Sequence, residues 1–190
     1  MAQIAEAVGL GVSSIYYYFN NKHALLERIV VDVNRVPLAI AAAAADAFED
    51  APRRLHVFVR NDAAALCQFP FDINEIHRLA GEDHSRFARY WADRQRLMVD
   101  IEDVVSQGIR DGHFIDVDAA LTALTILAND EAIQNWYRPV SVHPGAAPDD
   151  RSSPADIGCF VADLLLRGLL VDRSQLTAIR FDTHAALTFD

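Results

Sequence analysis

The fold of this chain is decided by residues 4–26, which read IAEAVGLGVSSIYYYFNNKHALL. Ala5, Gly9 and Ile15 have the spacing of a helix-turn-helix. The small Ala5 side chain lets two short helices approach closely, Gly9 suits the positive φ of the turn, and Ile15 packs the second helix into the core. The stretch therefore predicts two short helices joined by a tight turn.

The first residues of the second predicted helix are Val12, Ser13 and Ser14. In a helix-turn-helix these positions face base edges in the major groove of DNA. A serine hydroxyl can donate or accept a hydrogen bond, whereas Val12 offers an apolar contact that suits a thymine methyl group better than guanine. We therefore predict that these three residues read bases in double-stranded DNA.

Residues 4–19, followed by Lys22 and Leu25-Leu26, resemble the DNA-binding signature of the TetR family of transcriptional regulators. The resemblance is strong over about residues 2–30 and only architectural beyond. It implies a DNA operator as partner, a helical domain with a ligand cavity, and a homodimer formed through the last two helices. It also implies control of operator binding by a small-molecule effector, most simply as a repressor.

The resemblance also implies roles for single residues. Tyr17, Tyr18 and Lys22 would contact DNA phosphates, and Phe19 would belong to the core. The chain departs from the family pattern where Tyr18 replaces the usual histidine and where Gly11 replaces the serine that usually caps the recognition helix. A glycine cap costs only a few tenths of a kcal/mol, so neither departure removes the motif.

The family places one more helix ahead of this pair, which begins here at the first residue of the chain. The resemblance therefore implies a partial DNA-binding domain over residues 1–36, including the start of a connecting helix. We expect this chain to bind DNA less tightly than one extended at its N-terminus. The alternative is a dimeric helical protein that binds a small molecule and whose helix-turn-helix is a remnant.

Charge gives DNA binding no support. The chain has a formal net charge of −10, and phosphate contacts require Lys and Arg. Residues 1–35 are neutral, because their three cationic side chains are balanced by three acidic ones: Lys22, Arg28 and Arg35 against Glu6, Glu27 and Asp32. The motif alone therefore carries the prediction of DNA binding, and the neutral charge favours the alternative.

Composition predicts an all-α protein. The 190 residues are 52% apolar, with long Ala, Leu and Val stretches and almost no alternating β-type pattern. No apolar run approaches the roughly 20 residues that span a bilayer, and the start does not read as a signal peptide, so we expect a cytoplasmic protein without a membrane partner. Cys67 and Cys159 stand far apart and are interpreted as buried thiols, with no cofactor implied.

The apolar periodicity places a ligand-binding and dimerisation domain over residues 37–190. Pro37 interrupts a helical pattern and should kink or restart it. We leave the tail, residues 173–190, unassigned. The predicted helices of the whole chain cover about residues 2–8, 12–19, 22–36, 39–47, 51–69, 73–80, 85–111, 118–137 and 154–170.

Two of these helices, over Leu121–Tyr137 and Ile157–Leu170, are apolar on a broad face and come near the end of the chain. We interpret them as the two dimer helices. A homodimer also fits a helix-turn-helix protein, which needs two recognition helices for two half-sites one helical turn apart.

A ligand pocket is predicted from polar groups on apolar helix faces. Arg94 lies on the same helix face as Trp91 and Leu97, and Glu131 lies on the inward face of its own helix. A buried arginine needs a carboxylate or an anionic ligand, although an Arg–Glu pair or an arginine that reaches water would also explain the pattern. Aromatic residues could line this pocket or simply fill a core: Phe69, Phe71, Phe87, Tyr90, Trp91 and Trp136.

The segment 136–139 is similar to that of TetR-type regulators of lipid and acyl-CoA metabolism, which implies an acyl-CoA or another lipid-like effector. His77, Glu82 and His84 suggest a metal, but the break at Gly81 and the spacing of the histidines match no helical metal pair, so we interpret them as solvated turn residues. The sequence contains no GxSxG, phosphate loop or HExxH motif and therefore predicts no enzyme.

Overall fold

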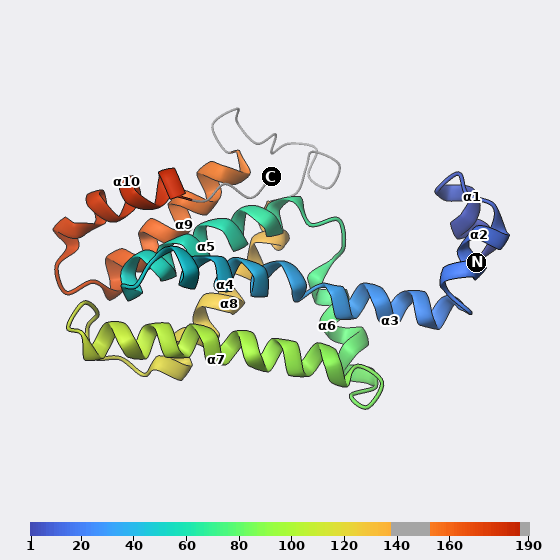
Figure 1. The fold of residues 1–190 in the computed structure, drawn as a ribbon, viewed down its shortest axis with the longest axis horizontal. Helices are drawn as coiled ribbons and strands as arrows, with labels where there is room; N and C mark the ends of the chain where they lie inside the picture. The colour runs from blue at the N-terminus through green and yellow to red at the C-terminus, as the bar shows by residue number, and fades with distance from the viewer. Residues whose placement is uncertain (138–152, 187–190) are drawn as a thin grey trace.

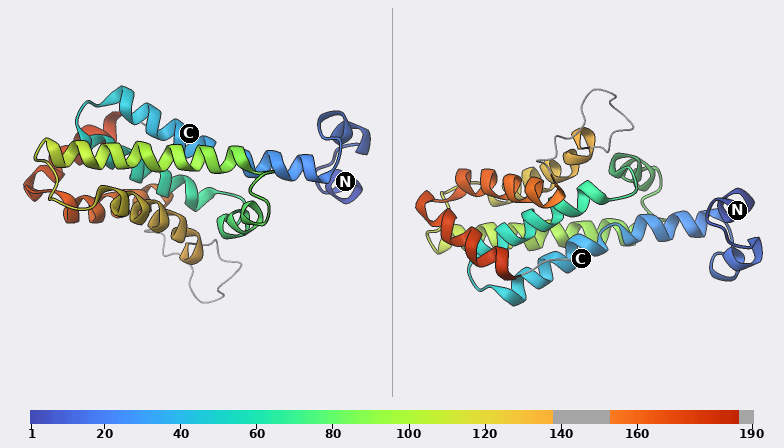
Figure 2. Two further views of the ribbon diagram at one scale, coloured as in Figure 1. Left: turned by 90° about the horizontal axis from the view of Figure 1, so that it is seen from below. Right: turned by 90° about the horizontal axis from the view of Figure 1, so that it is seen from above.

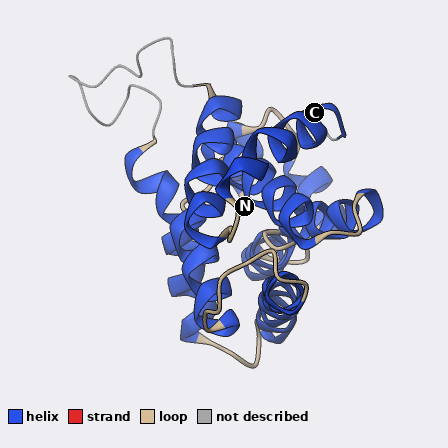
Figure 3. Ribbon diagram, turned by 90° about the vertical axis from the view of Figure 1, so that its left-hand side faces the viewer, coloured by secondary structure: helices blue, strands red, loops and turns tan. Residues whose placement is uncertain are grey.

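The computed structural model describes residues 1–137 and 153–186, and every regular element in these ranges is a helix (Figures 1 and 3). The all-α prediction is confirmed. No described helix is long and apolar enough to cross a membrane. The elements are α1 (Ala2–Ala7), α2 (Val12–Tyr18), α3 (Lys22–Asp32), α4 (Arg35–Ala47), α5 (Ala51–Gln68), α6 (Ile73–Glu82), α7 (Ala88–Arg110), α8 (Ala119–Trp136), α9 (Pro154–Leu169), the 3-10 helix η1 (Arg173–Gln175) and α10 (Leu176–Ala186).

Helix α5 is the centre of the larger body, where α4, α7, α8, α9 and α10 all pack against it (Figure 2). It begins where the Asp50 side chain accepts a hydrogen bond from the Arg53 amide and where proline occupies the first turn. Leu55 and Phe58 of this helix are buried with Ile101 of α7 in the main hydrophobic core. A core built on one central helix needs neighbours on all sides.

Close packing of α5 against α9 depends on Gly158. A Cβ atom at this position would lie 2.1 Å from the backbone carbonyl oxygen of Arg60. Real Cβ atoms do not approach a backbone oxygen so closely, so only glycine permits the observed distance between the helices. Helix α9 starts with a capping box formed by Ser153 and Asp156, with the Asp156 amide 3.2 Å from the Ser153 hydroxyl.

Helix α3 projects from this body and carries α1 and α2 at its far end (Figures 1 and 2). Its N-cap is Asn21, whose side chain accepts a hydrogen bond from the Ala24 amide at 2.8 Å. We call α1, α2 and α3 the arm. The helix pair is therefore presented away from the bundle.

The helix that follows Lys22 is interrupted at Val33 and Asn34, before the proline that was expected to break it. Pro37 is the third residue of α4. Amide groups in the first turn have no acceptor within the helix, so a proline there loses no hydrogen bond. The prediction of a restart is confirmed, but its position at Pro37 is wrong by about one turn.

Two further boundaries differ from the predicted ones. Helix α7 begins at Ala88, not Ser85. The Asp83 side chain accepts a hydrogen bond from the Arg86 amide at 3.0 Å, and this bond holds residues 84–87 in a turn. The unassigned tail contains α10, so α8 and α9 are not the last two helices of the chain.

Candidate functional site

Helices α1 and α2 form the predicted helix-turn-helix. Ala5 and Ile15 are buried between them, at 1% and 7% exposure. Gly9 has φ of +66°, the left-handed conformation in which glycine is favoured. The turn is closed by the Leu10 amide, which donates to the Ala5 carbonyl at 2.9 Å. The local sequence thus produces the motif geometry through these four residues.

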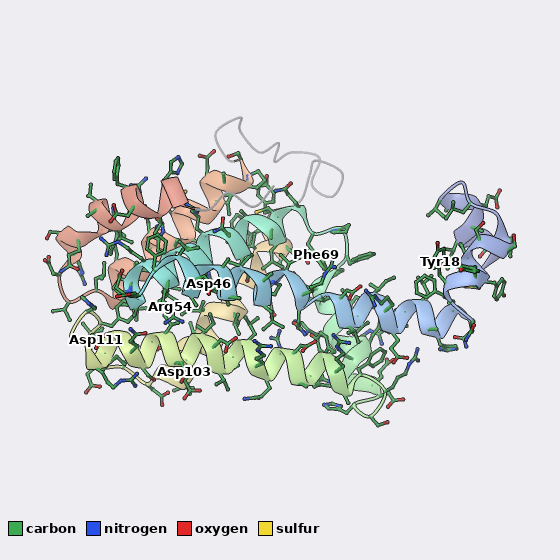
Figure 4. The ribbon with its side chains drawn as sticks, viewed as in Figure 1. Tyr18, Asp46, Arg54, Phe69, Asp103 and Asp111 are labelled. Atoms are coloured by element: carbon green, nitrogen blue, oxygen red, sulfur yellow. The ribbon has the colours of Figure 1, made fainter. Side chains whose placement is uncertain are left out.

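The outer face of α2 holds the residues that the sequence assigned to DNA. Ser13 and Ser14 are exposed, as is Val12 at 42%. Tyr17 and Tyr18 are exposed by 82% and 75%, with their rings edge to face and 5.0 Å between centroids. Lys22 is exposed at the first turn of α3, and Phe19 is partly buried. Figure 4 shows Tyr18 at the end of the molecule remote from the helical body.

The arm joins the body through a small second core. Val30 of α3 is fully buried against Ile76 and Ala80 of α6 and against Phe87 and Tyr90 at the start of α7. Four of the aromatic residues predicted for a pocket pack in or against this core: Phe69, Phe87, Tyr90 and Trp91. The structure therefore places them where the arm meets the body.

Next to this core, Arg94 of α7 and Glu131 of α8 form a bidentate ion pair, with 3.1 Å between Nη2 and Oε2. The structure thus contains the Arg–Glu pair that the sequence analysis gave as an alternative to an anionic ligand. His77 of α6 adds Nε2 at 3.1 Å from Glu131 Oε2, and its Nδ1 is hydrogen-bonded with the Tyr90 hydroxyl. Burial raises the pKa of Glu131, but the contacts with His77 and Arg94 outweigh it and lower this pKa.

Two more carboxyl groups lie buried beside this pair. Asp62 of α5 is 5% exposed, and its burial, together with the charge of Glu131, raises its pKa to about 7. Asp130 of α8 is completely buried, and neither of its carboxyl oxygens has a hydrogen-bond partner among the described residues. Burial and then the charge of Asp62 raise the Asp130 pKa well above its usual value. Four helices, α5, α6, α7 and α8, thus contribute to one acidic, partly neutralised cluster.

The structure separates some predicted residues from this cluster. Trp136 is 56% exposed at the end of α8, and Phe71 is 44% exposed. Trp136 is the last residue of α8 and Phe71 lies in the loop between α5 and α6, so neither belongs to the buried group. Arg138 and Pro139, which complete the segment compared with acyl-CoA regulators, lie outside the described residues.

Of the two histidines interpreted as solvated turn residues, His84 is exposed in a turn as predicted, whereas the prediction for His77 is wrong. His77 belongs to α6 and is not a solvated turn residue, because its ring reaches inward to Tyr90 and Glu131. The His84 ring stacks on Trp91, with 4.8 Å between centroids and 3° between planes. Glu82 pairs with Arg78 on the surface. Within the described residues, no three His, Cys, Asp or Glu side chains form a group that could hold a metal ion.

Asp62 and Asp130 were not found by the sequence analysis, although a signal was present. Each is an acidic residue on an otherwise apolar face: Asp62 precedes a run of alanines in α5, and Asp130 follows Ile126 and Leu127 in α8. Charged residues are rarely buried without a partner, so such positions are worth marking before a structure exists.

The helix-turn-helix arm and the helical body together define a DNA-binding regulator class, and comparison with known proteins makes the assignment specific. Residues 54–169 match the family model described as tetracyclin repressor-like, C-terminal domain, and residues 1–29 match the model described as bacterial regulatory proteins, tetR family. The chain therefore belongs to the TetR family of regulatory proteins. A comparison with curated protein sequences gives no match.

Solved structures share the fold at low sequence identity. The ketosteroid transcriptional regulator KstR2 of Mycobacterium tuberculosis matches with a TM-score of 0.72 and 22% identity over 90% of this chain and 84% of its own. The TetR family regulator PfmR from Thermus thermophilus has a TM-score of 0.73 and 22% identity, with 90% and 88% covered. AibR, in complex with isovaleryl coenzyme A and operator DNA, matches with a TM-score of 0.68 and 19% identity over 88% of this chain and 85% of its own.

Proposed function

We propose that the chain is a dimeric transcriptional repressor in which α2 reads an operator and a small effector in the helical body controls that binding. The observation that carries the proposal is the exposed face of α2 on an arm held away from the body (Figure 4). Val12, Ser13 and Ser14 would contact bases, while Tyr17 and Tyr18 would contact phosphates.

The junction between the arm and the body supports control by an effector. Phe87, at the N-cap of α7, and Tyr90 of α7 pack on Val30 of the arm. The ion pair of Arg94 with Glu131 of α8 lies one turn beyond Tyr90 along α7. A ligand that binds beside Trp91 and Arg94 would favour one packing of this core and thereby one position of α3. Such a ligand changes operator affinity only if it binds the two arm positions with different affinities.

The effector class that we propose is an acyl-CoA or a similar lipid-like thioester. AibR is seen with isovaleryl coenzyme A, and KstR2 is described as a ketosteroid regulator. Arg94 would exchange its ion pair with Glu131 for an anionic group of the ligand, and Phe69, Phe87 and Trp91 would border the apolar part of the ligand. Binding of acyl-CoAs to the chain can be measured by isothermal titration. Absence of heat with short, long and sterol-derived thioesters would overturn this effector class.

Dimerisation would use α8 and α9. Leu121 and Leu124 of α8 are exposed by 61% and 49%, and Phe160 and Leu164 of α9 by 63% and 61%. Large apolar side chains at helical spacing on two helices give a face that a second copy can cover. The dimer would hold two arms, as two half-sites require.

The DNA-binding proposal is tested by selecting bound sequences from random double-stranded DNA and titrating the enriched sequence. We expect Tyr17→Ala to weaken binding to specific and random DNA alike, and Ser13→Ala to reduce the preference between them. Phe181→Ala, an exposed aromatic on α10, is the matched control and should bind as the parent chain does. No enrichment over random DNA would instead favour the remnant alternative, which the neutral charge of residues 1–35 supports.

A further inference from the structure

A cleft separates α4 from α7 on the body, away from the Arg94–Glu131 pair, and has a volume of about 230 Å³. Its α4 side is formed by small residues, among them Ala41, Ala42 and Ala45. Its floor includes Leu55 and Phe58 of α5. Cavities for drug-sized ligands measure roughly 300–1,000 Å³, so this cleft suits a smaller molecule with an apolar part.

A cation without a counter-ion among the described residues lines the cleft. Arg54 of α5 uses Nη1 to donate to the Gln107 amide oxygen at 3.1 Å, which is a neutral partner. Its Nε is buried and has no hydrogen-bond partner among the described residues. No described carboxylate lies within ion-pair distance of this guanidinium, whereas the adjacent Arg53 pairs with Asp50 and Asp182. A partly buried guanidinium in this state favours an anion.

The remaining charges on the cleft wall come from α7. Arg96 and Asp100 lie 3.9 Å apart and offset one another. Asp103 has no ion pair with a described residue and lies beside the cleft. The charges left over are one cation at the floor, Arg54, and one anion at the rim, Asp103. Figure 4 shows them on α5 and α7 at the end of the molecule opposite Tyr18.

We propose that this cleft binds a small zwitterion, of the chemical class of an apolar α-amino acid. The ligand carboxylate accepts hydrogen bonds from Arg54, its ammonium group pairs with Asp103, and its side chain lies against the alanine face of α4. A ligand with a single charge would leave one of the two protein charges without a partner. The site is separate from the effector site proposed above and does not depend on DNA binding.

The test is isothermal titration of the full chain with l-leucine, l-valine and l-phenylalanine, together with two analogues of leucine. Isopentylamine lacks the carboxylate, and 4-methylpentanoate lacks the ammonium group. We expect at least one amino acid to bind, and leucine to bind about tenfold or more tightly than either analogue. The proposal is overturned if none of the three amino acids binds, or if an analogue binds as tightly as leucine.

Two variants locate the site without changing Arg54. Asp103→Asn should weaken leucine about tenfold and leave 4-methylpentanoate unaffected, because only the ammonium contact is lost. Ala42→Leu should abolish binding by filling the cleft. Asp46→Asn, at an exposed α4 aspartate that does not line the cleft, is the matched control and should bind as the parent chain does. Leucine binding that survives both cleft variants would place it elsewhere and contradict the assignment.

These titrations contain no DNA. Failure of the amino-acid site therefore leaves the proposed regulator function standing, and failure of operator binding leaves the amino-acid site standing.

Discussion

Asn34, in the break between α3 and α4, donates a hydrogen bond from Nδ2 to the backbone carbonyl of Tyr90 in α7 at 2.9 Å. Asn34 is 3% exposed and Tyr90 is fully buried. The two residues are 56 positions apart in the chain, so this contact fixes the point where the arm leaves the body. Because the Asn34 side-chain amide ties this break to α7, a shift of α7 can move α3, and a shift of α3 can move α7.

Replacing this amide should loosen the junction. Asn34→Ala removes a buried hydrogen bond, and we expect it to lower the free energy of unfolding by about 1–2 kcal/mol. Amide hydrogen exchange in α3 should also accelerate, because the arm loses an anchor. Asn135→Ala, which removes an exposed contact with Asn74, should cost less than about 0.5 kcal/mol. Equal effects of the two variants on α3 exchange would show that Asn34 does not anchor the arm.

Asp62 makes the stability of the folded chain depend on pH in a predictable direction. An exposed aspartate titrates near 4, whereas burial raises the pKa of Asp62 in the folded chain to about 7. Between these values the folded state holds a proton that the unfolded state has released, so stability falls as the pH rises from about 4 to 7. Each pKa unit corresponds to about 1.4 kcal/mol.

Asp62→Asn should therefore raise the melting temperature at pH 8 and change it much less at pH 4. The difference between variant and parent across pH is the quantity to measure, because it cancels contributions of other groups. His56 is one such group: burial lowers its pKa, so its contribution is lost as the pH falls below about 6.5. Asp116→Asn, at an exposed aspartate, is the control. A variant that parallels the parent from pH 4 to 8 would contradict this account.

Two glycines of α9 offer a matched pair. Gly158→Ala would place a Cβ 2.1 Å from the Arg60 carbonyl oxygen and must push α9 away from α5. We expect a loss of about 1–3 kcal/mol in the free energy of unfolding, the usual range for overpacking. At Gly168 a Cβ meets no atom within 4 Å, so Gly168→Ala should stabilise by up to about 1 kcal/mol through helix propensity. Denaturant titration of both variants measures these changes, and a neutral Gly158→Ala would disprove the close approach.

Local signals in the sequence were sufficient to predict most of the helices. Gly9, Asp50 and Ser153 each mark a turn or a helix start by their own chemistry, and the structure uses all three in that way. The position of α10 could not be predicted in the same way. Its contacts with the body join residues that are distant in sequence: Leu176 and Ile179 are buried in the main hydrophobic core, and Arg53 pairs with Asp182.

The buried cluster was predictable only in part. Arg94 and Glu131 were found because an arginine on an apolar helix face needs a counter-charge. Asp62 and His77 join them from two other helices, α5 and α6. Which polar residue of one helix meets which residue of another depends on how the helices are rotated and spaced, and no pattern within a single helix contains that information.

The last prediction concerns the exposed apolar face of α8 and α9. If it is the dimer interface, Leu164→Glu introduces a charge into a desolvated apolar contact and should shift the chain from dimer to monomer. Leu164 is 61% exposed, so this change leaves the core of the protomer intact and its circular dichroism unaltered. Phe181→Glu on α10, at a residue exposed by 79%, is the matched control and should remain dimeric in analytical ultracentrifugation. The opposite pattern, with Phe181→Glu monomeric and Leu164→Glu dimeric, would move the interface to α10, and a monomeric parent chain would refute dimerisation through this face.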